Sequence, residues 1–222
     1  MNTCCKAVIF DLDGTLLDTI ADLADSMNYT LEQFNMPTHE LPHHIKSIGN
    51  GLKKYAERSV TKENNNDEFL DKFVSMLARR YRENSMVKTV PFDGIFELLK
   101  FLEDENIIIN ILSNKRDEFV KELVAHYFPD LKFKCANGEL PKVPRKPDPS
   151  AALNIAKECN IAPEEILFIG DSIYDIQTGK NAKMKTIAVT WGYQPQDMLL
   201  KENPDFLANK PEDIVNYIKS NS

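Results

Sequence analysis

Two aspartates, a glycine and a threonine follow the first apolar run of the chain, residues 6–10. That run is short and partly β-branched, which predicts a strand covered on both faces. In an extended chain residues i and i+2 point the same way, with Cα atoms about 6.5 Å apart, so Asp11 and Asp13 can reach one small site that suits a hard divalent cation. Gly14 permits a sharp turn, and Thr15 adds a hydroxyl donor. The alternative is an ordinary Asp-Gly turn after a strand.

Polar residues also stand at the ends of later predicted strands and before one predicted helix. They are Ser113-Asn114 after the apolar run 107–112, Lys146 within Arg145-Lys146-Pro147-Asp148-Pro149, and Asp171 with Asp175 after the apolar run 166–169. A hydroxyl and an amide can donate hydrogen bonds to an oxyanion. Each block alone has a structural explanation, as a strand-end turn, a solvated loop or a helix cap. Because ligands of open parallel sheets bind at the carboxyl ends of the strands, the blocks together predict one site.

The spacing of apolar residues divides the chain into two kinds of structure. Between residues 16 and 88 they recur at helical spacing without a strand-like run, which predicts an all-helical insertion too long for a loop. From residue 90 onward strand-like runs alternate with helical ones, which predicts a parallel sheet with right-handed crossovers. The predicted fold is α/β, with a doubly wound, mostly parallel, Rossmann-like core. Residues 1–15 and 89–222 are expected to form this core, and residues 16–88 an inserted all-helical domain.

The composition is that of a globular protein able to bury a core, with 42% hydrophobic and 27% charged residues among 222. The net charge of -7 argues against nucleic acid or an anionic membrane as a partner. The four cysteines lack the spacing of a metal site, and we expect them to be reduced thiols. The pattern predicts neither a signal peptide nor a membrane span, so we expect a cytoplasmic protein, either a monomer or a homodimer.

The block Asp11-Leu12-Asp13-Gly14-Thr15 resembles the first signature of the haloacid dehalogenase superfamily, whose commonest members are magnesium-dependent phosphatases. The later blocks resemble the remaining signatures in order, and the resemblance covers essentially the whole chain. It implies that Asp11 is the nucleophile, which forms an aspartyl-phosphate, and that Asp13 is the general acid and base. It also implies that the helical insertion is a cap, which closes over the site and determines specificity.

The resemblance also assigns roles to the other polar residues. Lys146 would keep the crowded carboxylates ionised, since it offsets their mutual repulsion. The residues expected to bind the phosphoryl group are Thr15, Ser113, Asn114 and Lys146. The implied cofactor is Mg2+, and the residues expected to hold it are Asp11, Asp171 and the backbone carbonyl of Asp13, with Asp175 close behind them. The implied partner is a small phosphorylated metabolite.

Within the insertion, Gly49-Asn50-Gly51 and the following helix with Arg58 resemble the cap segment of phosphoglycolate phosphatases. A helix N-terminus with basic residues nearby could bind a small carboxylate. The alternative is a helix-helix turn followed by a solvated basic face. His39, His43 and His44 lie in the same insertion, and we expect them at the surface rather than as ligands.

The resemblance predicts a phosphatase for a small phosphate monoester, with 2-phosphoglycolate as the leading substrate. Broad specificity for sugar phosphates or nucleotides would need the same core, and a β-phosphoglucomutase-like mutase would share the same signatures. Dehalogenases typically lack the second acid, so Asp13 disfavours that activity. A receiver-like signalling domain does not match the order of the acids and has no use for a cap. A silent binding protein would be expected to have lost an acid or Lys146.

Overall fold

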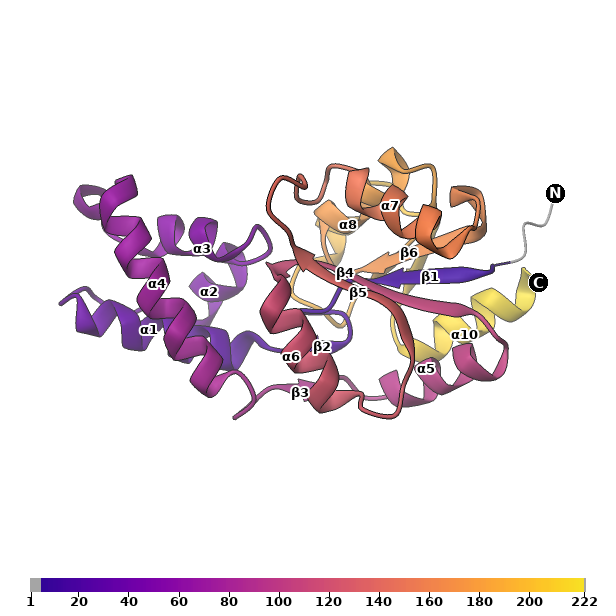
Figure 1. The fold of residues 1–222 in the computed structure, drawn as a ribbon, viewed down its shortest axis with the longest axis horizontal. Helices are drawn as coiled ribbons and strands as arrows, with labels where there is room; N and C mark the ends of the chain where they lie inside the picture. The colour runs from indigo at the N-terminus through magenta and orange to yellow at the C-terminus, as the bar shows by residue number, and fades with distance from the viewer. Residues whose placement is uncertain (1–4, 222) are drawn as a thin grey trace.

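The computed structural model describes residues 5–221, so Cys4 lies outside the described residues. One six-stranded sheet runs through the molecule in the order β5-β4-β1-β6-β7-β8, and all of its strand pairs are parallel (Figure 1). The strands are β1 (Ala7–Phe10), β4 (Ile108–Arg116), β5 (Phe133–Glu139), β6 (Ile166–Gly170), β7 (Lys185–Val189) and β8 (Phe206–Ala208). The predicted α/β fold with a doubly wound parallel sheet is confirmed.

The central strand β1 is buried on both faces, as its unbroken apolar sequence predicts. Val8 and Phe10 pack with the apolar cluster that α5 and α10 complete, whereas Ala7 and Ile9 face the cluster that includes α7. The helices around the sheet are α5 (Ile95–Asp104), α6 (Asp117–Tyr127), α7 (Ser150–Cys159), α8 (Ile173–Asn181), α9 (Gln196–Lys201) and α10 (Pro211–Ser220). Burial of each large aliphatic side chain contributes about 1.5–3 kcal/mol, so the position of Asp11 at the end of β1 is firmly fixed.

Four helices lie together beside the carboxyl ends of the strands, on the left in Figure 1. They are α1 (Ile20–Gln33), α2 (Leu41–Ser47), α3 (Leu52–Ser59) and α4 (Asp67–Asn84), with a short 3-10 turn at Lys62–Asn64. Their apolar faces share a core that includes Met27, Tyr55 and Phe73, as helical spacing predicts. Phe119 of α6 also joins this core, so the helical unit packs directly on the α/β unit. The division of the chain at residues 16–88 remains our proposal for the cap.

The entry into the helical unit differs from the prediction. Leu16 and Leu17 were expected on the first helix, but α1 begins at Ile20 and both leucines belong to the core of the sheet. The short strand β2 (Leu17–Asp18) pairs antiparallel with β3 (Val90–Pro91), so the expectation of no strand in this segment is wrong. A two-residue strand is too short to produce a period in the sequence. The two segments of chain that connect the sheet to the helical unit therefore lie side by side.

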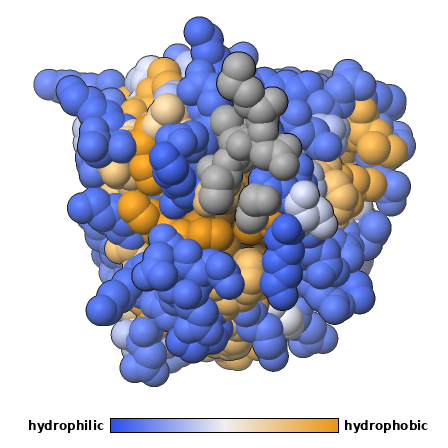
Figure 2. Space-filling view, turned by 90° about the vertical axis from the view of Figure 1, so that its right-hand side faces the viewer, coloured by the Kyte–Doolittle hydropathy of each residue, from blue (hydrophilic) through white to orange (hydrophobic). Residues whose placement is uncertain are grey.

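The end of the molecule opposite the helical unit has a mainly hydrophilic surface with an apolar strip across its centre (Figure 2). No helix within residues 5–221 has the length and apolar character needed to cross a membrane. The thiols of Cys135 and Cys159 are free, as predicted, and burial raises the pKa of Cys135 to about 12. The expected surface position is wrong for His44, which is fully buried and hydrogen-bonded at 2.6 Å to the hydroxyl of Tyr55.

Candidate active site

The predicted strand ends meet at one pocket between the sheet and the helical unit. The pocket has an empty volume of about 750 Å3, part of it open to solvent. From the sheet it is lined by Asp11, Asp13, Ser113, Asn114 and Asp171, and from the helical unit by Leu23, Ile45, Ile48, Gly49, Gly51, Leu52, Tyr55 and Tyr81. A polar floor under a largely apolar roof is a common arrangement for a small-molecule site.

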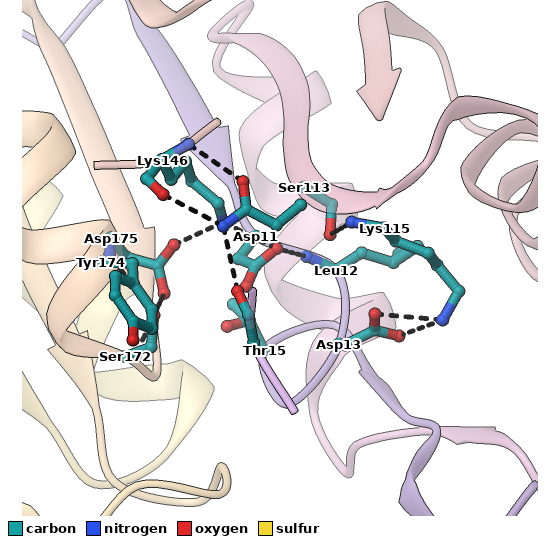
Figure 3. A network of polar contacts seen from close by, with 12 residues as sticks. Asp11, Leu12, Asp13, Thr15, Ser113, Lys115, Lys146, Ser172, Tyr174 and Asp175 are labelled. Carbon is teal, nitrogen blue, oxygen red and sulfur yellow. Dashed lines mark hydrogen bonds and ion pairs between the residues drawn. The ribbon is translucent and has the colours of Figure 1, made fainter. Parts of the chain in front are cut away.

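Lys146 links two of the carboxylates in the floor of the pocket (Figure 3). Its ammonium lies 3.0 Å from Oδ1 of Asp11 and 2.6 Å from Oδ1 of Asp175, and its side chain is only 2% exposed. Burial would lower the pKa of Lys146, but the two carboxylates outweigh burial and raise it. The residue is therefore a permanent cation at neutral pH, as the resemblance implies.

Asp175 is held in place by the start of helix α8. Ser172 caps this helix, and its hydroxyl and backbone N–H both donate to Oδ2 of Asp175. The other carboxylate oxygen accepts the bond from Lys146, so both oxygens of Asp175 are engaged. A side chain at Gly170 would collide with this carboxylate, which explains the glycine. Asp175 therefore positions Lys146 and the capped turn.

Asp11, Asp171 and Asp175 form a cluster of buried carboxylates whose ligand atoms lie within 4.8 Å of one another. Burial raises the pKa of Asp11 to about 6, against the lowering effect of Lys146 and with help from Asp175 and Asp13. Burial and the neighbouring Asp175 raise the pKa of Asp171 well above its usual range. One ammonium thus leaves negative charge uncompensated, and carboxylate oxygens are the ligands that Mg2+ prefers. The cluster fits a divalent cation.

Gly14 explains how Asp171 can approach the first strand end. Its φ of +80° lies in the region that favours glycine, and a side chain there would collide with the Asp171 carboxylate. Oδ2 of Asp171 accepts a hydrogen bond of 2.7 Å from the backbone N–H of Tyr193. The glycine in the turn after β1 therefore allows Asp171, which follows β6, to lie against this turn.

The raised pKa of Asp11 predicts that the stability of the metal-free protein falls as pH rises. The folded state retains a proton to about pH 6, whereas the unfolded carboxyl loses it near 3.8, so the folded state binds more protons between these values. The free energy of unfolding should fall by about 2–3 kcal/mol through this window. Urea denaturation in chelator at pH 4.5 and 7 measures the change. Asp11→Asn should remove this part of the pH dependence, and an equal slope in that variant would contradict the prediction.

Lys146 should be essential for stability as well as activity. Lys146→Met leaves the carboxylates of Asp11 and Asp175 buried without their cation, and loss of one partner of a buried ion pair costs about 3–5 kcal/mol. We expect that decrease in the free energy of unfolding, measured by urea denaturation in chelator at pH 7. The exposed Lys142 lies in the same loop. Lys142→Met is the control and should change stability by less than about 0.5 kcal/mol. Equal effects of the two variants would refute the role of Lys146.

Asp13 lies apart from the cluster, paired with a lysine that the sequence reasoning missed. The ammonium of Lys115 donates to Oδ1 and Oδ2 of Asp13 at 2.8 and 3.0 Å, and the Thr19 hydroxyl donates to Oδ1 at 2.7 Å. Lys115 follows Ser113 by two residues in β4, and both residues line the pocket. That spacing was the available signal. The prediction ended the strand at residue 112 and considered only Ser113 and Asn114 beyond it, so Lys115 was not singled out.

Asn114 does not present a free amide to the pocket. Its side chain donates to the carbonyl oxygens of Gly49 and Lys146 at 3.0 and 3.2 Å, and accepts a bond from the backbone N–H of Lys146. Arg145 adds a bond of 2.9 Å to the carbonyl of Asn50. These contacts join the 49–51 turn of the helical unit to the core.

Four of the predicted substrate-binding residues do not line the pocket, namely Thr15, Asn50, Arg58 and Lys146. Thr15 is fully buried, and its hydroxyl donates to Oδ1 of Asp171 at 3.5 Å. Arg58 is exposed and donates to Oδ1 of Asn50 and to the carbonyl of Ser47. Gly49 does line the pocket, whereas Asn50 does not. The structure thus brings together Asp11, Asp13, Ser113, Asn114 and Asp171 at the pocket wall, with Lys146 directly beneath.

Comparison with known proteins agrees with this architecture. The model of the haloacid dehalogenase-like hydrolase family matches residues 8–189. The chain is 30% identical to the phosphoglycolate phosphatase of Aquifex aeolicus over 215 residues, which is 95% of each protein. A crystal structure from Lactobacillus delbrueckii superposes with a TM-score of 0.89 at 29% identity, covering 96% of this chain and 98% of that one. A predicted phosphoglycolate phosphatase from Haemophilus somnus gives 0.86 at 26% identity, covering 96% and 97%. The chain therefore belongs to the haloacid dehalogenase-like hydrolase family.

Proposed function

We propose that this enzyme, a phosphoric monoester hydrolase, is a Mg2+-dependent phosphatase that works through an aspartyl-phosphate on Asp11. The observation that carries the proposal is the set of three buried carboxylates around one buried ammonium at the end of the central strand. Phosphoryl transfer needs an in-line nucleophile and neutralisation of the charge on the phosphoryl oxygens. Asp11 lines the pocket in which the ester would bind, so it can act as the nucleophile. The resemblance of the chain to the family implies the same role for Asp11.

Each residue of the site has its own role in the proposed reaction. Asp11 attacks phosphorus, while the Ser113 hydroxyl and the Lys146 ammonium bind phosphoryl oxygens. Asp13 gives a proton to the leaving oxygen and then takes one from the water that hydrolyses the acyl phosphate. Asp13 must turn away from Lys115 to do so, because both of its oxygens accept bonds from that lysine.

Asp11, Asp171 and the backbone carbonyl of Asp13 would hold Mg2+, with Asp175 behind them. When bound, the ion supplies positive charge that stabilises the phosphoryl oxygens and the carboxylates. The raised pKa values of Asp11 and Asp171 support a cation here, because burial makes their ionised forms costly without one.

We propose 2-phosphoglycolate as the substrate. The relatives named above support a small two-carbon acid, since the Aquifex aeolicus protein is a phosphoglycolate phosphatase. The apolar roof from Leu23, Leu52 and Tyr55 would exclude water from a small ester rather than bind the hydroxyls of a sugar.

Phosphate release from a panel of esters tests the proposal. The panel contains 2-phosphoglycolate, a hexose phosphate, a mononucleotide and p-nitrophenyl phosphate, each with Mg2+ and with chelator. We expect metal-dependent release, with the highest kcat/KM for 2-phosphoglycolate. Equal turnover of the hexose phosphate or the mononucleotide would refute the substrate, and release that persists in chelator would refute the metal-dependent chemistry.

A further inference from the structure

Lys115 is a buried cation that the proposed reaction leaves without a role. Its side chain is 5% exposed, and it lines the pocket between the core and the helical unit. Its ammonium lies 4.6 Å from the centre of the Tyr81 ring, which belongs to helix α4. Figure 3 shows the pair of Lys115 and Asp13 separate from the cluster around Lys146. Lys115 therefore places a buried ammonium on the pocket wall, apart from the cluster around Asp11.

The structure shows what this ammonium requires. A buried charge is costly unless an opposite charge or several hydrogen bonds accompany it. Within residues 5–221 the anion that forms an ion pair with Lys115 is Asp13. Yet Asp13 has to leave that pair to reach the leaving oxygen of the substrate. A Lys115 that loses Asp13 needs another anion in the same position.

We propose that Lys115 binds the second anionic group of the substrate, a carboxylate, in exchange for Asp13. This inference rests on the proposed phosphatase function and names the class of substrate, a phosphate ester that also carries an acid group. The exchange conserves the charge balance around Lys115 and leaves Asp13 free to act at the ester oxygen. An ester without a second anion leaves Asp13 bound to the lysine, so the carboxylate affects kcat as well as KM.

The position of Lys115 suits this role. Ser113 and Lys115 are two residues apart in β4, and both line the pocket, so a phosphoryl group beside Ser113 has the Lys115 ammonium on the same pocket wall. The aromatic rings of Tyr81 and Phe119 line the same pocket, and a low local dielectric strengthens a lysine-carboxylate pair.

Arg116 is the competing cation, because it also lines the pocket. Its side chain is 37% exposed and lies 3.7 Å from the Glu118 carboxylate. An exposed pair of this kind is worth little, and the rim offers a weaker site for an anion than a buried ammonium. The two residues are adjacent in sequence, which makes Arg116→Gln a matched control for Lys115→Gln.

Three esters that differ only at the second group test the inference. They are 2-phosphoglycolate, its neutral amide 2-phosphoglycolamide, and ethylene glycol monophosphate. We expect the wild-type enzyme to prefer the carboxylate over the amide by about 10²-fold in kcat/KM, as for a buried charge pair. Lys115→Gln should reduce that preference to a few-fold, because it weakens binding of the carboxylate ester and no longer holds Asp13 away from the amide. Lys115→Arg should keep most of it, and Arg116→Gln all of it. A cooperative thermal melt reports that the glutamine variant is folded.

Each other outcome has a defined meaning. A wild-type preference that Lys115→Gln leaves unchanged would overturn the inference while the phosphatase function stands. Loss of the preference in Arg116→Gln would overturn the inference and would indicate that Arg116 binds the carboxylate. Release of phosphate from none of the esters would refute the proposed function instead. Calorimetry of 2-phosphoglycolate binding to Asp11→Asn protein then decides the inference, because a tenfold loss of affinity on adding Lys115→Gln supports it and equal affinity overturns it.

Discussion

Asp11→Asn should abolish phosphate release and stabilise the metal-free protein. The amide is not a nucleophile toward phosphorus, and removal of a nucleophile that acts with its partners costs about 10⁴-fold or more in kcat. The same substitution removes a charge whose ionised form is disfavoured by burial and by Asp175 and Asp13. We therefore expect a higher melting temperature than wild type in chelator at pH 7. The substitution thus lowers activity and raises stability, as expected for a site whose functional residues destabilise the folded protein.

Calorimetric melting and a phosphate-release assay on the same preparation measure both effects. Asp104→Asn is the control, because Asp104 lies at the surface on α5 in an ion pair with Lys100. It should leave activity and melting temperature unchanged. Activity of Asp11→Asn within tenfold of wild type would contradict the assignment of the nucleophile. A lower melting temperature in chelator would contradict the electrostatic account of the cluster.

Asp13→Asn should slow turnover by about 10³-fold, with a dependence on the leaving group that identifies its role. An alkoxide such as that of glycolate needs a proton as it departs, whereas p-nitrophenolate does not. For p-nitrophenyl phosphate the variant should therefore complete the first step and stall at the second, which gives a burst of p-nitrophenol. For 2-phosphoglycolate both steps should be slow. Stopped-flow absorbance measures the burst.

Asp18→Asn serves as the control for this experiment. Asp18 lies in the short strand β2, near the same turn, and accepts a hydrogen bond from the hydroxyl of Tyr193 that an asparagine can also accept. We expect activity within a few-fold of wild type. A general acid and base role for Asp13 fails if its variant slows the two esters equally and shows no burst.

The strand ends could be predicted because each is a local signal. Residues 7–10 and 166–169 are apolar runs followed by acids, and the structure places both at the centre of the sheet. Parallel strands bring their carboxyl ends to one edge of the sheet, which was enough to predict that Asp11 and Asp171 lie in the same site. The roles assigned to these residues remain proposals, but their assembly in one pocket follows from the fold.

The interactions that the sequence did not indicate are long-range and depend on side-chain direction. Asn114 was expected to bind phosphate, yet its amide joins Gly49 of the helical unit to the backbone of Lys146. Lys115 was not singled out, because β4 continues to Arg116, beyond the apolar run that ends at residue 112. Leu16 and Leu17 fit a helical period, but both side chains pack in the core of the sheet, and the first helix begins only at Ile20. In each case a tertiary contact overrode a local pattern.

The central claim is that Asp11 carries the phosphoryl group, and trapping that group tests it most directly. Asp13→Asn protein is mixed with p-nitrophenyl phosphate and Mg2+, quenched in acid within the burst, digested, and analysed by mass spectrometry. The account predicts a phosphoryl group on the peptide that contains Asp11, absent when Asp11→Asn is added. A burst with no phosphorylated peptide, or with the phosphoryl group on another residue, would contradict it.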